Sequence, residues 1–240
     1  MKQYLSAAVL LAAAALSPVA QAAQFTITPV RIFMSPRDRA VAVTVTNESD
    51  DEVVMQADLY IWKQKADGSD DLVLTEDLIL TPPILKLAPR ARQVVRLARL
   101  GGTPVGAQQS YRLIMREVPE ARAGSQLQLQ VALAFSLPIF ITPAGAKRDL
   151  QCGVERSAPD LVRAVCENTG NAYTQIRAIE VIDDKGARIA SRDTAGYLLP
   201  TVKRSFDVKR TDGRIPGGKI KLQVALDDGT QQAFDATLPE

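Results

Sequence analysis

Apolar residues alternate with polar or small ones along most of this chain, in short runs that end at turn-forming residues. A period of two places every second side chain on one face, which predicts strands that bury that face. The runs that we interpret as strands are 41–45, 53–62, 94–97, 111–118, 126–141, 160–166, 175–182 and 219–226. Strands at this spacing, with polar turns between them, favour β-sandwiches. We therefore expect an all-β protein.

A cluster of strand-breaking residues, Pro143-Ala144-Gly145-Ala146, interrupts this pattern. Strand patterns resume after it, and each side of the break has about the length of one sandwich domain. We expect an N-terminal domain over residues 23–143 and a C-terminal domain over residues 144–240.

The longest alternating run spans residues 126–141, with an apolar side chain at every odd position. Its length is about 16 residues, roughly 50 Å of strand, whereas an ordinary strand has about five or six residues. The run is either a long strand shared by two parts of the core, or an edge strand that adds to another polypeptide. Without a partner such an edge favours aggregation, so the second interpretation also implies a self-capping oligomer of the free protein.

The N-terminus has the pattern of a secretory signal. Lys2 is followed by an apolar run from Leu5 to Leu16, and Ala20-Gln21-Ala22 fits the small-x-small rule for signal peptidase. The apolar run is about 12 residues long, whereas a membrane-spanning helix needs about 20. We expect residues 1–22 to be removed after Ala22 and the remaining chain to be exported without membrane insertion.

The two cysteines, Cys152 and Cys166, are the only ones in the chain. In an exported protein an even pair of cysteines is typical of a disulfide, and a metal site would need more ligands than this sequence offers. We predict a disulfide that closes one hairpin; two free thiols are the alternative.

The composition excludes most enzyme chemistry. Histidine is absent from the sequence, so Ser-His-Asp and Cys-His triads, histidine-ligated metals and an imidazole proton shuttle are excluded. Adjacent carboxylates occur at Asp183/Asp184 and Asp227/Asp228. Both pairs lie beside glycine in apparent hairpin turns, where solvent-exposed aspartate is ordinary. We expect no catalytic residue, no metal and no cofactor.

The charge balance is nearly neutral, with 29 Lys+Arg against 27 Asp+Glu, which excludes a broadly basic nucleic-acid binder. Residues 78–116 nevertheless contain seven basic residues and no acidic one. We interpret most of them as a solvated face with partners elsewhere, although a subset can form a local site for a carboxylate. The seven are Lys86, Arg90, Arg92, Arg96, Arg99, Arg112 and Arg116.

Several motifs together resemble one known family. They are the segments 30–33 (VRIF), 81–89 (TPPILKLAP), 95–97 (VRL), 111–119 (YRLIMREVP) and 167–173 (ENTGNAY). In order and spacing these are similar to the periplasmic pilus-assembly chaperones of the chaperone/usher pathway, the PapD-like family. The resemblance covers nearly the whole exported chain.

This resemblance implies two immunoglobulin-like β-sandwich domains at an angle, with a cleft between them. It also implies that the last strand of the first domain is lent to a pilus subunit that lacks its own final strand. Release would follow by exchange with the next subunit's extension at an outer-membrane usher, without a nucleotide. Aligned on residues 130–133, the side chains that enter the subunit are Leu127, Leu129, Val131 and Leu133.

The family also uses a basic pair in the cleft to bind the subunit's terminal carboxylate. Arg31 falls at the family's arginine position, and a guanidinium suits a bidentate carboxylate contact. The family's lysine position is Pro138 here, which supplies neither charge nor backbone donor. Arg96 or another basic residue of 78–116 is the candidate for the second charge; a weaker anchor is the alternative. An ordinary exposed arginine remains an alternative role for Arg31.

The stretch 136–140 (SLPIF) is similar to the branch of the family associated with spore-coat-U-type subunits. Two structural roles compete with that of a chaperone: a secreted immunoglobulin-like adhesive protein, and a pilus subunit itself. A subunit would be one incomplete domain with an N-terminal extension. This chain has patterns for two domains, and its first strand begins close to Ala23.

Overall fold

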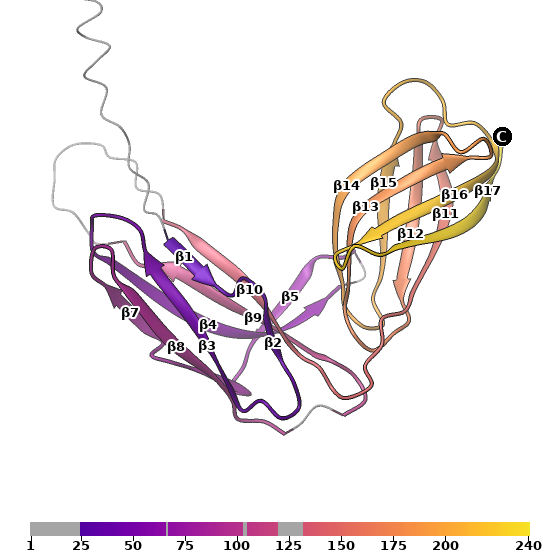
Figure 1. The fold of residues 1–240 in the computed structure, drawn as a ribbon. Coiled ribbons are helices and arrows are strands. Elements are labelled where there is room, and N and C mark those ends of the chain that lie inside the picture. Colours follow the sequence, from indigo (N-terminus) through magenta and orange to yellow (C-terminus); the bar gives the residue numbers. More distant parts are fainter. Residues whose placement is uncertain (1–24, 66, 103–104, 120–131) are drawn as a thin grey trace, which may run out of the picture.

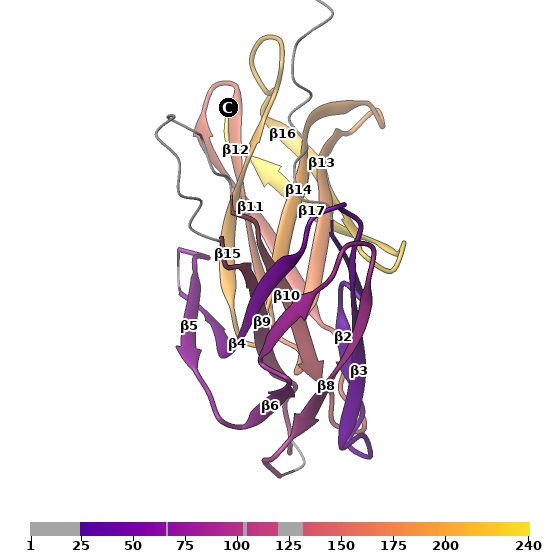
Figure 2. The same ribbon diagram turned by 90° about the vertical axis from the view of Figure 1, so that its left-hand side faces the viewer.

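The computed structural model describes residues 25–65, 67–102, 105–119 and 132–240. All regular elements within these ranges are strands, which confirms the all-β prediction. The strands form two units that meet at an angle, shown from two sides in Figures 1 and 2. Within the described ranges, no helix has the length and apolar character needed to cross a membrane.

The first unit is a sandwich of two sheets. One sheet has the strand order β1-β3-β8-β6, and the other has the order β2-β10-β9-β4-β5, with β7 paired to β4. The strands are β1 (Phe25–Thr28), β2 (Ile32–Met34), β3 (Ala40–Asn47), β4 (Val53–Gln64), β5 (Asp70–Leu74), β6 (Leu78–Thr81), β7 (Ile84–Leu87), β8 (Arg92–Arg99), β9 (Gln109–Glu117) and β10 (Ala134–Ile141).

Alternation along these strands builds the core between the two sheets. Val43 and Val45 on β3 face the same core as Leu113 and Met115 on β9, and all four side chains are fully buried. The residues between them point to the other face of each sheet, as the period of two requires. The aliphatic composition of the predicted strands is therefore used in one continuous core.

The second unit packs seven strands around its own core, in the order β11-β12-β15-β14-β13-β16-β17. The strands are β11 (Leu150–Ala158), β12 (Leu161–Asn168), β13 (Thr174–Asp183), β14 (Arg188–Leu198), β15 (Lys203–Lys209), β16 (Gly218–Leu226) and β17 (Gln231–Leu238). The connection between the two units runs from Ile141 to Leu150. The division at residues 143/144 falls within this connection and stays a prediction.

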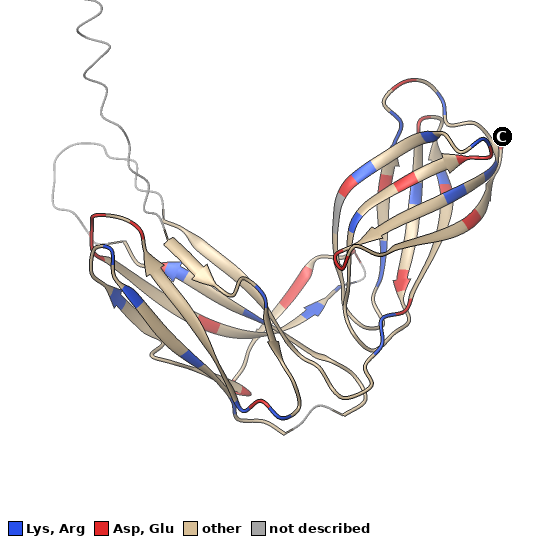
Figure 3. Ribbon diagram, in the orientation of Figure 1, with Lys and Arg blue, Asp and Glu red and all other residues tan. Residues whose placement is uncertain are grey.

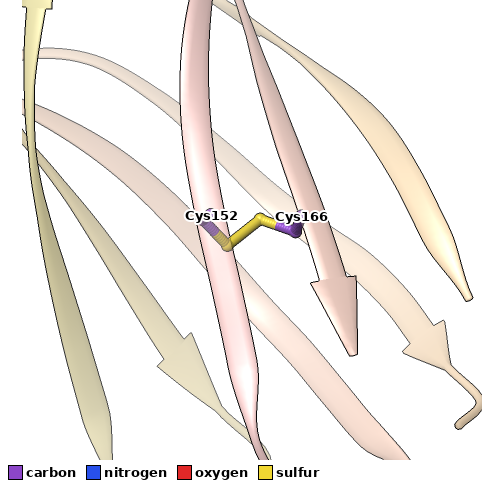
Figure 4. Close-up of a disulfide and its surroundings, with 2 residues drawn as sticks. All are labelled: Cys152 and Cys166. Atoms are coloured by element: carbon purple, nitrogen blue, oxygen red, sulfur yellow. A yellow bond between two sulfur atoms is a disulfide. The ribbon is translucent and has the colours of Figure 1, made fainter. Parts of the chain in front are cut away.

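The disulfide predicted between Cys152 and Cys166 is confirmed. The two residues lie directly opposite each other on β11 and β12, with an S–S distance of 2.05 Å (Figure 4). The bridge therefore links neighbouring strands of one hairpin and does not connect the two units.

Removal of this bridge is expected to destabilise the second unit. In the chain-entropy account, a loop of about 15 residues closed by a disulfide contributes about 3 kcal/mol. A Cys152→Ala/Cys166→Ala double variant should lose about that much unfolding free energy in urea titration. Reduction of the unaltered protein serves as the control, because it should give the same loss. Alkylation of both cysteines in the unreduced protein would contradict the bridge.

Candidate functional site

The first half of strand β10 is paired with a neighbouring strand on one side only. Along its whole length β10 pairs antiparallel with β9, from Ala134 opposite Arg116 to Ile141 opposite Gln109. On its other side it pairs with β2 only at residues 139–141. No described strand pairs with this side of residues 134–137, which we call the free edge of β10. Such an edge has unpaired N–H and C=O groups that can receive another strand.

The side chains of β10 divide between two faces. Leu137, Ile139 and Ile141 are buried in the core of the first unit, and Phe135 is partly buried against it. Ala134 and Ser136, at the even positions, are exposed. The odd-numbered apolar side chains that fill the core at residues 137–141 thus continue at Phe135, within the part of β10 whose backbone edge is free.

Leu133 extends this apolar face by one further odd position. Its side chain is partly buried, and its backbone N–H donates to Glu117 Oε2 at 3.2 Å. The Glu117 N–H in turn donates to the Leu133 carbonyl at 2.8 Å. The other predicted inserting residues, Leu127, Leu129 and Val131, lie outside the described residues. The same holds for residues 126–131 of the predicted strand 126–141, and the observed strand begins at Ala134.

Pro138 lies on β10 directly opposite Arg112 on β9. The Arg112 guanidinium stacks on Trp62, with its central carbon 3.6 Å from the ring centroid, and its Nη2 is 3.5 Å from Asp70 Oδ2. Only 11% of the Arg112 side chain is exposed, and this burial lowers the pKa of Arg112. Arg112 therefore has stacking and ionic partners within the protein at the level where the family's lysine is expected.

Arg31, between β1 and β2, reaches across to the second unit. Its Nη1 donates to Asp227 Oδ2 at 2.5 Å and to Gln175 Oε1 at 3.3 Å. The hydrogen bond to Asp227 raises the pKa of Arg31 above its ordinary value. The Arg31 side chain is still 30% exposed. The structure thus places Arg31 between the two units and gives it a carboxylate partner.

Asp227 lies at the centre of this network, just after β16. Besides Arg31, its carboxylate accepts hydrogen bonds from Arg148 Nη1 at 3.0 Å and from the Tyr173 hydroxyl at 3.3 Å. Its side chain is only 5% exposed. The expectation that Asp227 is a solvent-exposed turn residue is therefore wrong, because this turn packs against the first unit. The neighbouring Asp228 fits that expectation better, with 43% of its side chain exposed.

Arg96 is exposed on β8, in the sheet that does not contain β10. The structure shows no contact between the described side chains of Arg96 and Arg31, and a role for Arg96 in the anchor stays a prediction. Positively and negatively charged residues are interspersed along the ribbon of both units (Figure 3). Much of the basic stretch 78–116 has acidic partners elsewhere in the first unit: Lys86 with Glu52, Arg90 with Asp50, Arg112 with Asp70 and Arg116 with Asp58.

An aromatic cluster joins the two units beside the Arg31–Asp227 network, which Tyr173 of the cluster contacts. Phe140 on β10 stacks on Tyr173 of the second unit, with ring centroids 3.9 Å apart. Trp62 and Leu199 are buried in the same cluster, and Tyr197 packs edge-on against Trp62. The cluster was not anticipated from the sequence, since its rings come from positions far apart in the chain. The position of Phe140 at the end of the longest apolar run was the only signal available.

Polar contacts fix the same junction. The Gln64 side-chain amide donates to the Tyr197 carbonyl at 3.1 Å, and its Oε1 accepts the Leu199 N–H at 2.9 Å. The Gln108 Oε1 accepts the Tyr173 N–H at 2.9 Å. These contacts hold β10 and Arg31 in a defined position relative to the second unit.

Two immunoglobulin-like sandwiches at an angle, with an open edge on the last strand of the first, define a class of assembly chaperone. The profile described as "Pili and flagellar-assembly chaperone, PapD N-terminal domain" matches residues 24–147. The chain belongs to this family, which is not a family of enzymes.

Curated relatives share sequence with part of this chain. An uncharacterized fimbrial chaperone of Escherichia coli, YbgP, is 30% identical over 142 residues, which are 55% of this chain and 56% of that protein. The chaperone protein LpfB of Salmonella typhimurium is 27% identical over 121 residues, 49% of each chain. The chain thus matches about half the length of these relatives.

Solved structures share the fold of the whole two-unit protein. A chaperone–tip adhesion subunit complex from the archaic chaperone-usher Csu pili of Acinetobacter baumannii matches with a TM-score of 0.66, at 21% identity. The aligned region covers 90% of this chain and 100% of the matched chain. The Salmonella enterica SafA pilin–SafB chaperone complex matches with a TM-score of 0.58, at 16% identity, covering 92% of this chain and 99% of the matched chain.

Proposed function

We propose that this protein is a periplasmic chaperone that binds pilus subunits by donor-strand complementation and delivers them to an outer-membrane usher. The observation that carries the proposal is the free edge of β10. Its backbone is open on one side, and its apolar face is continuous with the core of the first unit. An incomplete subunit with an exposed apolar groove has the complementary surface.

Binding in this mode needs only strand pairing and burial. Backbone N–H and C=O groups pair along the new strand, while alternate side chains enter the groove of the subunit. Each apolar side chain that becomes fully buried contributes roughly 1.5–3 kcal/mol. The four residues proposed for this role are Leu127, Leu129, Val131 and Leu133. Before capture, self-association covers the same edge.

Two features support a periplasmic location. The first 22 residues have the pattern of an export signal, with cleavage proposed after Ala22. The Cys152–Cys166 disulfide is a bond that persists in oxidising compartments such as the bacterial periplasm.

The class of subunit is proposed from the stretch 136–140. Its similarity to the branch associated with spore-coat-U-type subunits, including Pro138, favours a subunit of that type. Co-expression with candidate periplasmic subunits, affinity purification and mass spectrometry of the bound proteins tests both the function and the class. Recovery of the protein at the cell surface without any bound subunit would instead support a secreted adhesive or structural role.

We propose that Arg31 binds the terminal carboxylate of the subunit. Loss of a charge-assisted hydrogen bond of this kind weakens binding roughly tenfold or more. Arg31→Ala should therefore reduce the affinity for the captured subunit, measured by titration with purified subunit released from the complex. Arg188→Ala is the matched control, because it removes an exposed arginine of β14 that pairs with Glu180 in the second unit. Equal affinities of the two variants would remove Arg31 from the site.

A further inference from the structure

The proposed anchor Arg31 already has a carboxylate partner from its own chain. Arg31 Nη1 lies 2.5 Å from Asp227 Oδ2, and this contact connects the first unit to the second. We infer that Asp227 occupies, in the free protein, the position on Arg31 that the subunit's terminal carboxylate takes on capture. This inference rests on the proposed function. It makes subunit capture and the Arg31–Asp227 ion pair mutually competitive.

Asp227 has other partners that remain when Arg31 is taken. Its Oδ1 accepts from Arg148 Nη1 at 3.0 Å, and the Tyr173 hydroxyl lies 3.3 Å from its Oδ2. Breaking a buried ion pair is costly mainly because it leaves one charge without a partner. Here the carboxylate that gives up Arg31 keeps an arginine and a hydroxyl. A competing carboxylate can therefore replace Asp227 on Arg31 without leaving Asp227 unpaired.

Arg148 is placed to hold Asp227 throughout this exchange. The same Nη1 that contacts Asp227 also lies 3.1 Å from Asp228 Oδ2, and the guanidinium lies 4.8 Å from the Tyr173 ring centroid. These three contacts all belong to the second unit, so they do not depend on the position of Arg31. Arg148 is thus a second cation beside Asp227, and it acts as a positioning residue for that carboxylate.

The charges of the site explain why Asp227 weakens the anchor. Arg31 and Arg148 carry two positive charges, and Asp227 and Asp228 carry two negative ones, so these four groups together are neutral. An incoming carboxylate meets an arginine whose charge is already compensated by a buried aspartate at hydrogen-bond distance. Removal of the Asp227 charge leaves an excess positive charge next to the binding position, which strengthens carboxylate binding.

Competition of this kind is reciprocal. A ligand that displaces Asp227 from Arg31 weakens the connection between the units, and a stronger connection weakens the ligand by the same factor. The aromatic cluster of Trp62, Phe140, Tyr173 and Leu199 does not include Arg31 or Asp227. It keeps the units together while the ion pair exchanges.

The test compares Asp227→Asn with Asp228→Asn. Asparagine at 227 keeps the size of the side chain and removes the charge that pairs with Arg31. Asparagine at 228 removes a more exposed charge that contacts Arg148 and not Arg31. The probe is a synthetic peptide of alternating valine and threonine, about ten residues long so that it can form an ordinary strand. It is prepared with a free terminal carboxylate and, separately, with a terminal amide.

We expect Asp227→Asn to bind the carboxylate peptide roughly tenfold more tightly than the unaltered protein, as for a gain of one charge-assisted hydrogen bond. The amidated peptide should bind both proteins equally. Asp228→Asn should give a much smaller gain with the carboxylate peptide, because 43% of the Asp228 side chain is exposed and its recorded ionic partner is Arg148. Asp227→Ser should reproduce the gain, and circular dichroism checks that each variant is folded.

Two results would overturn the inference in different ways. If the unaltered protein prefers the carboxylate peptide and Asp227→Asn shows no gain, Asp227 does not compete, while the anchor at Arg31 stands. If neither the unaltered protein nor Asp227→Asn prefers the carboxylate peptide over the amide, the terminal-carboxylate anchor itself is wrong and the inference fails with it. Subunit co-purification, measured separately, shows whether the chaperone function stands in either case.

Discussion

Replacement of Leu133 by aspartate is expected to abolish capture of a pilus subunit, while the chaperone itself stays folded. Leu133 directly precedes β10, continues the odd-numbered apolar positions of that strand, and is only partly buried. In the complex this side chain would enter the apolar groove of the subunit, where an unpaired carboxylate costs several kcal/mol. Affinity purification of the variant from cells that express a cognate subunit measures the loss.

Ala132→Asp provides the matched control for this variant. Ala132 is exposed and one position away, so in an extended donor strand its side chain would point to the opposite face. It introduces the same charge into the same segment, and subunit should still co-purify. Normal co-purification with Leu133→Asp would mean that this strand is not the one lent to the subunit.

Phe140→Ala is expected to lower the free energy of unfolding by about 3–5 kcal/mol, the usual cost of removing a buried phenylalanine. Phe140 is fully buried, and its ring lies 3.9 Å from that of Tyr173 in the other domain. The cavity therefore opens at the junction between the domains. Trp62, the single tryptophan, belongs to the same cluster, so its fluorescence during urea titration reports on this site.

The loss of stability in Phe140→Ala should be located at the junction between the domains. The Trp62 fluorescence transition should move to lower urea and separate from the transition measured by circular dichroism, because the junction opens before the sandwiches unfold. Phe234→Ala is the control, since Phe234 is partly buried against the core of the second domain and lies outside the junction cluster. Coincident transitions in both variants would show that the cluster does not connect the domains energetically.

The strand pattern and the disulfide were predictable from the sequence because both depend on local rules. The alternation over 53–62 and 111–118 corresponds closely to β4 and β9, whose buried residues fill one core. The cysteine pair followed from the number of cysteines and the inferred export. For the strands the relevant information lies within a few residues along the chain, and for the disulfide it lies in the cysteine count and the export pattern at residues 1–22.

The carboxylate network was not predictable in the same way. The turn after β16 has the composition of an exposed hairpin turn, and for Asp228 that interpretation agrees with the structure. Asp227, its neighbour, is buried because Arg31, which is 196 positions away along the chain, lies against it. Only the arrangement of the two domains brings these charges together, and local sequence patterns contain no record of that arrangement.

The pairing of β10 with β9 has a consequence for the entropy of binding. Residues 134–137 already have strand geometry in the free protein, because β9 holds them on one side. Fixing the backbone of one residue costs roughly 1–2 kcal/mol, and for these residues that cost is met when the chaperone itself folds. Over residues 134–137, a subunit that adds to this edge therefore has to order only its own strand. The edge is a rigid template, and its preorganisation lets a short stretch of backbone bind firmly.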